Sequence, residues 1–325
     1  MTTLKELPRE DLFTSGHTAC PGCGGAMVVR AAMKVLGPDT IVYMPASCLL
    51  VFSNMYPLAA FKVPTLHVLF ETSAVCAAGV RRALKRQGKD DVTVVAFAGD
   101  GGTADIGLQA LSGAAERNED ILYICYDNEA YMNTGIQRSS ATPFGAWTTT
   151  TPLGPSAEGQ GKLEYKKDVP RILMAHDVPY VATASPAFPA DFLRKLEKAK
   201  AKKGFRYLHV LSPCPVGWKT ESDQTVELAK LAVETGLFTL LEFEDGVFRL
   251  SREPRFSPLK EYLEKQGRFK HLTAEQVATI EAWIQTKWAR DRALAQALGP
   301  KAPAAPKQGR SPADAVKAEG AVSPA

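Results

Sequence analysis

One strand–helix–strand unit constrains the fold of this chain more than any other segment. Two short apolar runs, residues 92–97 and 121–126, are rich in β-branched and aromatic residues, as buried strands are. The residues between them, Ala104 to Arg117, favour a helix with one apolar face. This order implies a parallel strand pair joined by a right-handed crossover. The sequence therefore predicts an α/β fold with a mostly parallel sheet and helices on both faces.

Both predicted strands end in tight turns that contain an acid: Gly99-Asp100-Gly101-Gly102 and Asp127-Asn128-Glu129. Ligands of open α/β sheets bind at such carboxyl ends. Asp100 and Asn128 offer hard oxygens that suit Mg²⁺, and the glycines let backbone N–H groups approach an anion. This pattern predicts a Mg²⁺-diphosphate site; the alternative is two ordinary strand-end turns with a capping aspartate. The glycine spacing excludes both a P-loop and a dinucleotide fingerprint.

Four of the six cysteines are placed so that they can share one centre. Cys20 and Cys23 form a C-x₂-C pair in a Gly/Pro-rich turn, which by itself fits zinc, a redox dithiol or an iron–sulfur cluster. Cys48 follows a predicted strand at 41–44, and Cys214 follows another at 205–211. The other two, at positions 76 and 125, are interpreted as buried thiols.

Hydrophobic periodicity predicts further helices at 26–36, 74–87, 169–175, 189–202, 225–235 and 274–298, and strands at 66–70, 180–182 and 239–243. His67 lies in an apolar run and is interpreted as a core histidine. Residues 136–165 are irregular and rich in Thr, Gly and Pro, so we expect them to wrap a cofactor or a partner subunit. We divide the chain into an N-terminal arm (1–15), one cofactor-binding domain (16–250), a C-terminal helical extension (251–299) and a disordered Ala/Pro-rich tail (300–325).

Bulk properties exclude several classes of protein. A net charge of +4 over 325 residues is too balanced for a nucleic-acid-binding protein. No apolar run approaches the roughly 18 residues that span a bilayer, and the N-terminus has no apolar signal segment. We therefore expect a cytoplasmic protein without membrane contact, whose cysteines are not a disulfide framework.

Together these motifs resemble the β subunit of the 2-oxoacid:ferredoxin oxidoreductases, among which pyruvate:ferredoxin oxidoreductase matches best. The resemblance covers about residues 14–250, with GHTACPGCGG, GDGG…DNEAYMNTGIQRS and SPCPVGW in family order. It implies a thiamine diphosphate-binding fold with three cofactors: thiamine diphosphate, Mg²⁺ and one 4Fe–4S cluster.

The resemblance also implies roles for single residues. The cluster ligands would be Cys20, Cys23, Cys48 and Cys214. The Mg²⁺ ligands would be the side chains of Asp100 and Asn128 and the carbonyl of Ala130. Asn133 would lie beside the thiazolium as a catalytic residue, and the diphosphate would be lined by Gly99, Gly101, Gly102 and Thr134. Ile136 stands where the family often has glycine, a departure that we interpret as minor.

The activity implied is pyruvate + coenzyme A + oxidised ferredoxin = acetyl-CoA + CO₂ + reduced ferredoxin, run in either direction. The chain would be inactive alone: an α subunit would supply the activating glutamate and most substrate contacts, α or γ would bind coenzyme A, and a δ subunit would carry relay clusters to ferredoxin. Three alternatives stay open: another 2-oxoacid (2-oxoisovalerate, an aryl oxoacid or oxalate), a non-redox thiamine diphosphate decarboxylase subunit, and a zinc-stabilised assembly subunit.

Overall fold

A single eight-stranded sheet forms the centre of the computed structural model, which describes residues 5–153 and 159–300. The strand order is β2-β1-β3-β4-β6-β5-β7-β8. The six strands from β2 to β5 in this order are parallel, and β7 and β8 add an antiparallel edge. The strands are β1 Thr40–Pro45, β2 Thr65–Val68, β3 Thr93–Gly99, β4 Leu122–Asp127, β5 Tyr180–Ala184, β6 Arg206–Leu211, β7 Leu241–Glu244 and β8 Val247–Leu250. The predicted mostly parallel α/β sheet is confirmed.

The register of the central strands places several chain turns at one edge of the sheet. In β3 and β4, Gly99 pairs with Tyr126, and in β4 and β6, Asp127 pairs with Leu211. The residues that follow these strands, Asp100, Asn128 and Ser212, therefore emerge side by side. Parallel strands end at a common edge, so this arrangement follows directly from the pairing.

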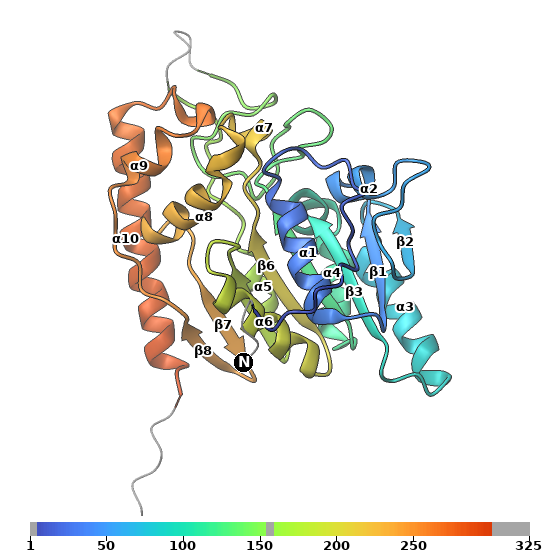
Figure 1. Ribbon diagram of the computed structural model, residues 1–325. Helices are drawn as coiled ribbons and strands as arrows, with labels where there is room; N and C mark the ends of the chain where they lie inside the picture. The colour runs from blue at the N-terminus through green and yellow to red at the C-terminus, as the bar shows by residue number, and fades with distance from the viewer. Residues whose placement is uncertain (1–4, 154–158, 301–325) are drawn as a thin grey trace, which may run out of the picture.

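Helices cover both faces of the sheet (Figure 1). One apolar core lies between the sheet and helices α1 and α6, and a second lies between the sheet and α3, α4 and α5. The helices are α1 Gly24–Leu36, α2 Cys48–Ser53, α3 Ser73–Arg86, α4 Leu108–Glu116, α5 Val169–Met174, α6 Pro189–Ala201, α7 Pro215–Trp218, α8 Thr225–Glu234, α9 Leu259–Leu263 and α10 Ala274–Ala297. Short 3₁₀ turns, η2 Ser222–Gln224 and η3 Gly267–Phe269, complete the C-terminal half. Within the described residues, no helix has the length and apolar character needed to cross a bilayer.

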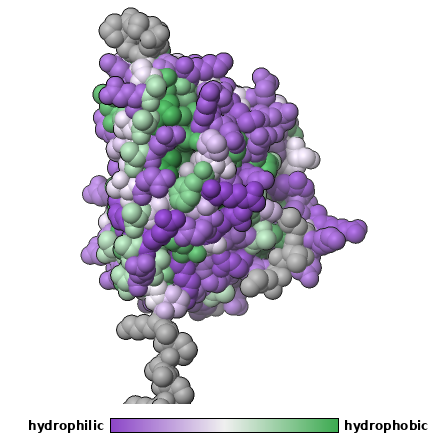
Figure 2. Space-filling model, turned by 90° about the vertical axis from the view of Figure 1, so that its left-hand side faces the viewer, coloured by the Kyte–Doolittle hydropathy of each residue, from purple (hydrophilic) through white to green (hydrophobic). Residues whose placement is uncertain are grey.

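A third apolar core joins the C-terminal helices to the rest of the molecule. It contains residues of α8, α9 and α10 together with Leu211 at the end of β6 and Trp218 at the end of α7. Helix α10 contributes a stripe of buried residues at Ile280, Ile284 and Trp288, which is the spacing of one helix face. Hydrophilic residues cover most of the outer side that α10 occupies (Figure 2).

Two local predictions are wrong, and a third is displaced by two residues. The helix predicted from Ala104 begins instead as a π-helical turn, η1 Gly102–Ile106, and α4 starts only after Gly107. A β-carbon at Gly107 would lie 2.1 Å from the Gly102 carbonyl oxygen, so the wider turn depends on this glycine. His67 is exposed rather than buried, because β2 is the outermost strand of the sheet. The strand predicted at 239–243 is present as β7 but begins at Leu241, and it pairs with β8, a strand that was not predicted.

Candidate functional site

An open pocket lies at the carboxyl edge of the sheet. The turn between β3 and η1, the loop after β4 and the start of α2 form its walls. All eight residues predicted to contact the cofactor line it: Gly99, Asp100, Gly101, Gly102, Asn128, Ala130, Asn133 and Thr134. The structure thus brings together two turns that are 28 residues apart in the chain.

The three predicted Mg²⁺ ligands converge inside this pocket. One orientation of the Asn128 amide places its oxygen 2.9 Å from Asp100 Oδ1 and 2.8 Å from the carbonyl oxygen of Ala130. In the other orientation the amide nitrogen donates to both oxygens at those distances. Three oxygens this close need either a donor or a cation between them. One carboxylate, one amide and one carbonyl oxygen fit Mg²⁺, which completes its shell with phosphate oxygens and water.

The carboxylate of Asp100 is buried and held on both sides. Ser139 Oγ donates to its Oδ2 at 2.5 Å, and the backbone N–H of Asn128 donates to its Oδ1 at 3.3 Å. Burial, and then the nearby charge of Asp127, raise the pKa of Asp100 well above its usual range. A divalent cation at this position would favour the ionised form instead. Ser139 lies in the loop that was predicted to wrap the cofactor and is the last residue of the DNEAYMNTGIQRS motif, but the sequence alone assigned it no role.

Asp127 lies behind the metal position and carries a second buried network. Its carboxylate accepts a hydrogen bond from the ring nitrogen Nε2 of His209 at 2.7 Å and forms an ion pair with Lys166. Burial opposes ionisation, but Lys166 and then His209 hold the pKa of Asp127 below its ordinary value. Lys166 also pairs with Glu129 at 2.9 Å. Lys166 and His209 were not predicted to take part, because their contact with Asp127 depends on long-range folding.

Packing against Tyr131 requires glycine at position 101, in addition to any contact with the cofactor. A β-carbon there would lie 2.2 Å from the ring of Tyr131, whose hydroxyl donates to Asp105 at 2.7 Å. The ring therefore fixes the loop after β4 against the turn after β3.

Asn133 and Thr134 lie on the exposed part of the same loop. The Thr134 hydroxyl bonds Gln137 Oε1 at 2.5 Å, which ties it to its own turn. The Asn133 amide has no hydrogen-bond partner among the described residues, although it lines the pocket.

A second pocket adjoins the first, and the four predicted cluster cysteines line it. Cys48, Asn128 and Asn133 contribute to the walls of both pockets. Cys23 caps α1, Cys48 is the first residue of α2, and Cys214 caps α7, so three of the four sulfurs lie where backbone N–H groups have no partner within the helix. One such group, the N–H of Gly217, donates to Cys214 Sγ at 3.4 Å.

The chemistry of these thiols fits a centre with positive charge. Burial, and then the neighbouring sulfurs of Cys214 and Cys23, raise the pKa of Cys48 to about 12. Burial likewise raises the pKa of Cys214 to about 11. No lysine or arginine of the described chain lines this pocket, so iron or another metal would have to stabilise the thiolates.

The six cysteines do not all lie at this pocket. Among the residues described, no three His, Cys, Asp or Glu side chains converge as they would around a single ion. The remaining cysteines lie elsewhere: Cys125 is buried as predicted, whereas Cys76 is only half-buried.

Comparison with known proteins agrees with this geometry. Residues 46–210 match the family "Thiamine pyrophosphate enzyme, C-terminal TPP binding domain". The chain is 53% identical over 282 residues to the pyruvate synthase subunit PorB of Methanothermobacter thermautotrophicus, covering 86% of this chain and 97% of that one. It is 46% identical over 303 residues to the ketoisovalerate oxidoreductase subunit VorB of Pyrococcus abyssi, covering 90% and 96%.

Among solved structures, the chain resembles a 2-oxoglutarate:ferredoxin oxidoreductase from Magnetococcus marinus. The TM-score is 0.51 at 22% sequence identity, covering 69% of this chain and 78% of that one. At this identity, the likeness shows a shared fold.

Proposed function

This chain belongs to the thiamine diphosphate-binding β subunits of the 2-oxoacid:ferredoxin oxidoreductases, and we propose that it acts within a complex on pyruvate. The reversible reaction would convert pyruvate, coenzyme A and oxidised ferredoxin to acetyl-CoA, CO₂ and reduced ferredoxin. The preference for pyruvate rests on the PorB relatives. The VorB relatives keep 2-oxoisovalerate as the main alternative substrate. The cytoplasmic setting stays a prediction.

One observation carries the proposal: the oxygen-lined pocket and the four-cysteine pocket share Cys48, Asn128 and Asn133. Groups held in the two pockets would be immediate neighbours. When bound, thiamine diphosphate supplies an electron sink for decarboxylation, and a 4Fe–4S cluster takes up electrons one at a time. A decarboxylase without a redox step does not require the four-cysteine pocket.

The chain's own residues would hold and orient these groups. Asp100, Asn128 and the Ala130 carbonyl would bind Mg²⁺, with Gly99, Gly101, Gly102 and Thr134 along the diphosphate. Cys20, Cys23, Cys48 and Cys214 would bind the cluster. Ser139 would keep the Asp100 carboxylate directed at the metal through its 2.5 Å hydrogen bond.

We assign Asn133 a catalytic role beside the reacting carbon. Its amide lines both pockets and is not engaged with the described residues around it, which supports a role towards a ligand over a role in stabilising the turn. An uncharged amide can donate to a developing oxyanion, and loss of one such donor typically costs about 10²–10³ in rate.

Partner subunits would complete the site. Asp100 is the one acidic residue of the described chain among those that line the first pocket, so the glutamate that activates thiamine diphosphate would come from an α subunit. Large apolar side chains are exposed in the pocket wall and next to it in sequence: Val51, which lines the pocket, is 40% exposed, and Leu69, which precedes the lining residue Phe70, is 69% exposed. Such patches mark interaction surfaces, and we propose that the α subunit covers them. γ and δ subunits, coenzyme A and ferredoxin remain the further predicted partners.

The metal site is tested by Asp100→Ala in the assembled complex. The variant removes the one charged ligand, so Mg²⁺-dependent thiamine diphosphate binding should be lost in calorimetry while the iron content stays normal. Asp90→Ala is the matched control, since Asp90 lies near the opposite end of β3 with an exposed carboxylate. Retained cofactor affinity in Asp100→Ala would place the site elsewhere.

The cluster is tested by Cys48→Ala against Cys76→Ala. Anaerobically purified protein should be brown with about four irons per chain, and only Cys48→Ala should lower iron content and viologen reduction together. Stoichiometric zinc without iron in fresh protein would support the assembly-subunit alternative and contradict this proposal. A panel of 2-oxoacids assayed with the wild-type complex then identifies the substrate.

A further inference from the structure

Arg268 lies in η3, inside the segment predicted to be a C-terminal helical extension, yet it is buried beside the cofactor loops. Its side chain is 2% exposed. The guanidinium donates to Glu129 Oε2 at 2.6 Å and to Gln266 Oε1 at 2.9 Å. It also lies over the ring of Trp218, 3.9 Å from the ring centroid. A buried arginine with this set of contacts is held in one conformation.

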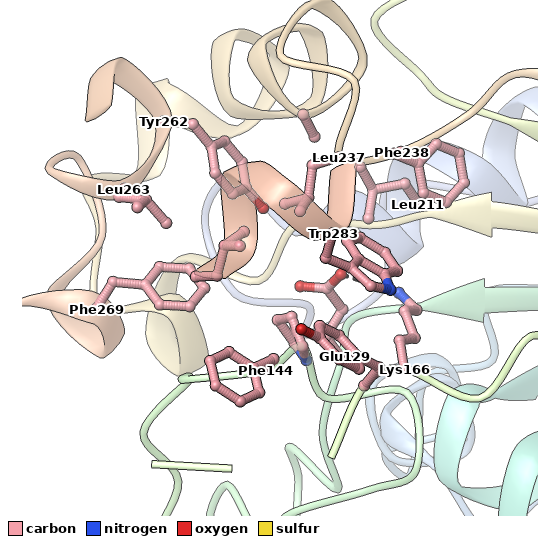
Figure 3. Close-up of a pocket in the computed structure, with 14 residues that line it drawn as sticks. Glu129, Phe144, Lys166, Leu211, Leu237, Phe238, Tyr262, Leu263, Phe269 and Trp283 are labelled. Atoms are coloured by element: carbon pink, nitrogen blue, oxygen red, sulfur yellow. Dashed lines mark hydrogen bonds and ion pairs between the residues drawn. The ribbon is translucent and has the colours of Figure 1, made fainter. Parts of the chain in front are cut away.

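The Glu129 contact fixes the loop that carries two of the proposed Mg²⁺ ligands. Glu129 lies between Asn128 and Ala130, and its φ of 70° is uncommon for a residue other than glycine. Asn128 and Ala130 face the cofactor pocket, whereas Glu129 lines a different, mostly apolar pocket behind it, together with Lys166 (Figure 3). The carboxylate of Glu129 therefore anchors the loop from the rear, between Lys166 at 2.9 Å and Arg268 at 2.6 Å.

Trp218 links the same arginine to the cysteine side of the site. Its indole Nε1 donates to the carbonyl oxygen of Asn128 at 2.9 Å. Trp218 ends α7, the short helix that Cys214 caps, and the Trp218 N–H donates to the Cys214 carbonyl at 2.8 Å. The stacked guanidinium and indole thus touch the metal loop at two successive residues, Asn128 and Glu129.

We propose that Arg268 is a positioning residue that fixes the Asn128–Ala130 loop relative to the Cys214–Trp218 segment, so that the Mg²⁺ ligands are set before the cofactor binds. This inference rests on the proposed function, because it concerns the same metal. Mg²⁺ demands near-ideal octahedral geometry, so a loop free to leave its left-handed conformation binds the metal less well. Outer residues of this kind typically contribute 10–100-fold in metal affinity.

The test measures the affinity of the assembled complex for Mg²⁺. Bound Mg²⁺ is first removed with a chelator, and Mg²⁺ is then titrated back in a calorimeter at saturating thiamine diphosphate. Arg268→Met should weaken Mg²⁺ binding about 10–100-fold. Arg268→Lys should recover part of this loss, because it keeps a charge near Glu129 but cannot donate through a planar fork or stack fully on Trp218. Arg292→Met is the matched control: Arg292 also pairs with a glutamate, Glu253, but on the surface, and its loss should leave Mg²⁺ affinity unchanged.

A double-mutant cycle separates positioning from general stability. Glu129→Gln combined with Arg268→Met should weaken Mg²⁺ binding by less than the two single variants added together, because the two residues share one contact, while the pairing of Glu129 with Lys166 and the stacking of Arg268 on Trp218 are separate. Glu129→Gln combined with Arg292→Met should be additive. The cycle also works with Arg268→Lys, should Arg268→Met fail to fold.

A lowered melting temperature with unchanged Mg²⁺ affinity, or full additivity of the Glu129 and Arg268 variants, would overturn the inference. Its failure is distinct from failure of the proposed function. If Asp100→Ala retains Mg²⁺-dependent cofactor binding, the metal site itself is misassigned. If Asp100→Ala loses this binding while Arg268→Met keeps the Mg²⁺ affinity of the wild type, only the positioning role of Arg268 is wrong.

Discussion

Ile136 shows how a single residue can carry a constraint that sequence interpretation treated as minor. Its φ is 64°, a left-handed conformation that is costly for a β-branched residue. Glycine adopts it freely, which explains why a glycine at this position suits the family. The conformation is held from both sides: its N–H donates to the Met132 carbonyl at 3.3 Å, and its carbonyl accepts from Thr149 N–H at 2.9 Å.

Ile136→Gly should therefore change the free energy of unfolding by less than about 1 kcal/mol. Relief of about 1–2 kcal/mol of left-handed strain offsets the lost side-chain contacts and the 0.5–1 kcal/mol entropy cost of glycine. Ile41→Gly is the control, since Ile41 is also half-buried but lies in the regular strand β1. Because Ile41 has no strain to relieve, this variant should lower the free energy of unfolding by about 2 kcal/mol. Urea unfolding measures both; equal losses would show that Ile136 is not strained.

At the scale of elements, the approach of α1 to the end of β6 builds the cysteine pocket. Gly24 is the first residue of α1, and its N–H donates to the Pro213 carbonyl at 3.1 Å. A β-carbon at Gly24 would lie 2.7 Å from that same oxygen. This contact brings the C-x₂-C turn against the residue before Cys214, although almost 190 residues separate them in the chain.

Gly24→Ala should push these two segments apart, with a loss of about 1–3 kcal/mol in stability and a lower iron content. Gly79→Ala is the matched control: it lies inside α3, and a β-carbon there meets nothing within 4 Å. It should leave iron unchanged and raise stability by up to about 1 kcal/mol, because alanine is the better helix former. Normal iron in Gly24→Ala would mean that the pocket tolerates the displacement.

At the scale of the whole molecule, the third apolar core makes the C-terminal helices part of the cofactor-binding unit. Trp288 of α10 is 1% exposed and donates to the Gly236 carbonyl at 2.8 Å. The same core contains Trp218, which contacts the metal loop through Asn128. The domain boundary at 250/251 stays a prediction, and the shared core favours cooperative unfolding across it.

Trp288→Ala should lower the free energy of unfolding by about 3–5 kcal/mol and keep a single urea transition, because the cavity lies in a core that both parts share. Leu298→Ala, at an exposed position just beyond α10, should cost less than about 1 kcal/mol. A separate early transition of the C-terminal helices would show instead that residues 251–299 unfold independently.

The sequence by itself determined the features that depend on neighbours along the chain. Apolar runs marked the parallel strands, and the turns after them supplied Asp100, Asn128, Cys48 and Cys214, while a Gly/Pro-rich turn supplied Cys20 and Cys23, because strand ends and tight turns are encoded within a few residues. Tail residues 301–325 lie outside the described part of the chain, so their predicted disorder stays a prediction.

Only the tertiary structure decided which distant residues meet. Arg268 contacts Glu129 across 139 positions of sequence, and His209 contacts Asp127 across 82. The edge position of β2, which exposes His67, depends on strand order, and the backbone of Ile136 depends on contacts with Met132 and Thr149. No local periodicity encodes such pairings, because burial and ion-pair geometry are fixed only when the sheet and its three cores have assembled.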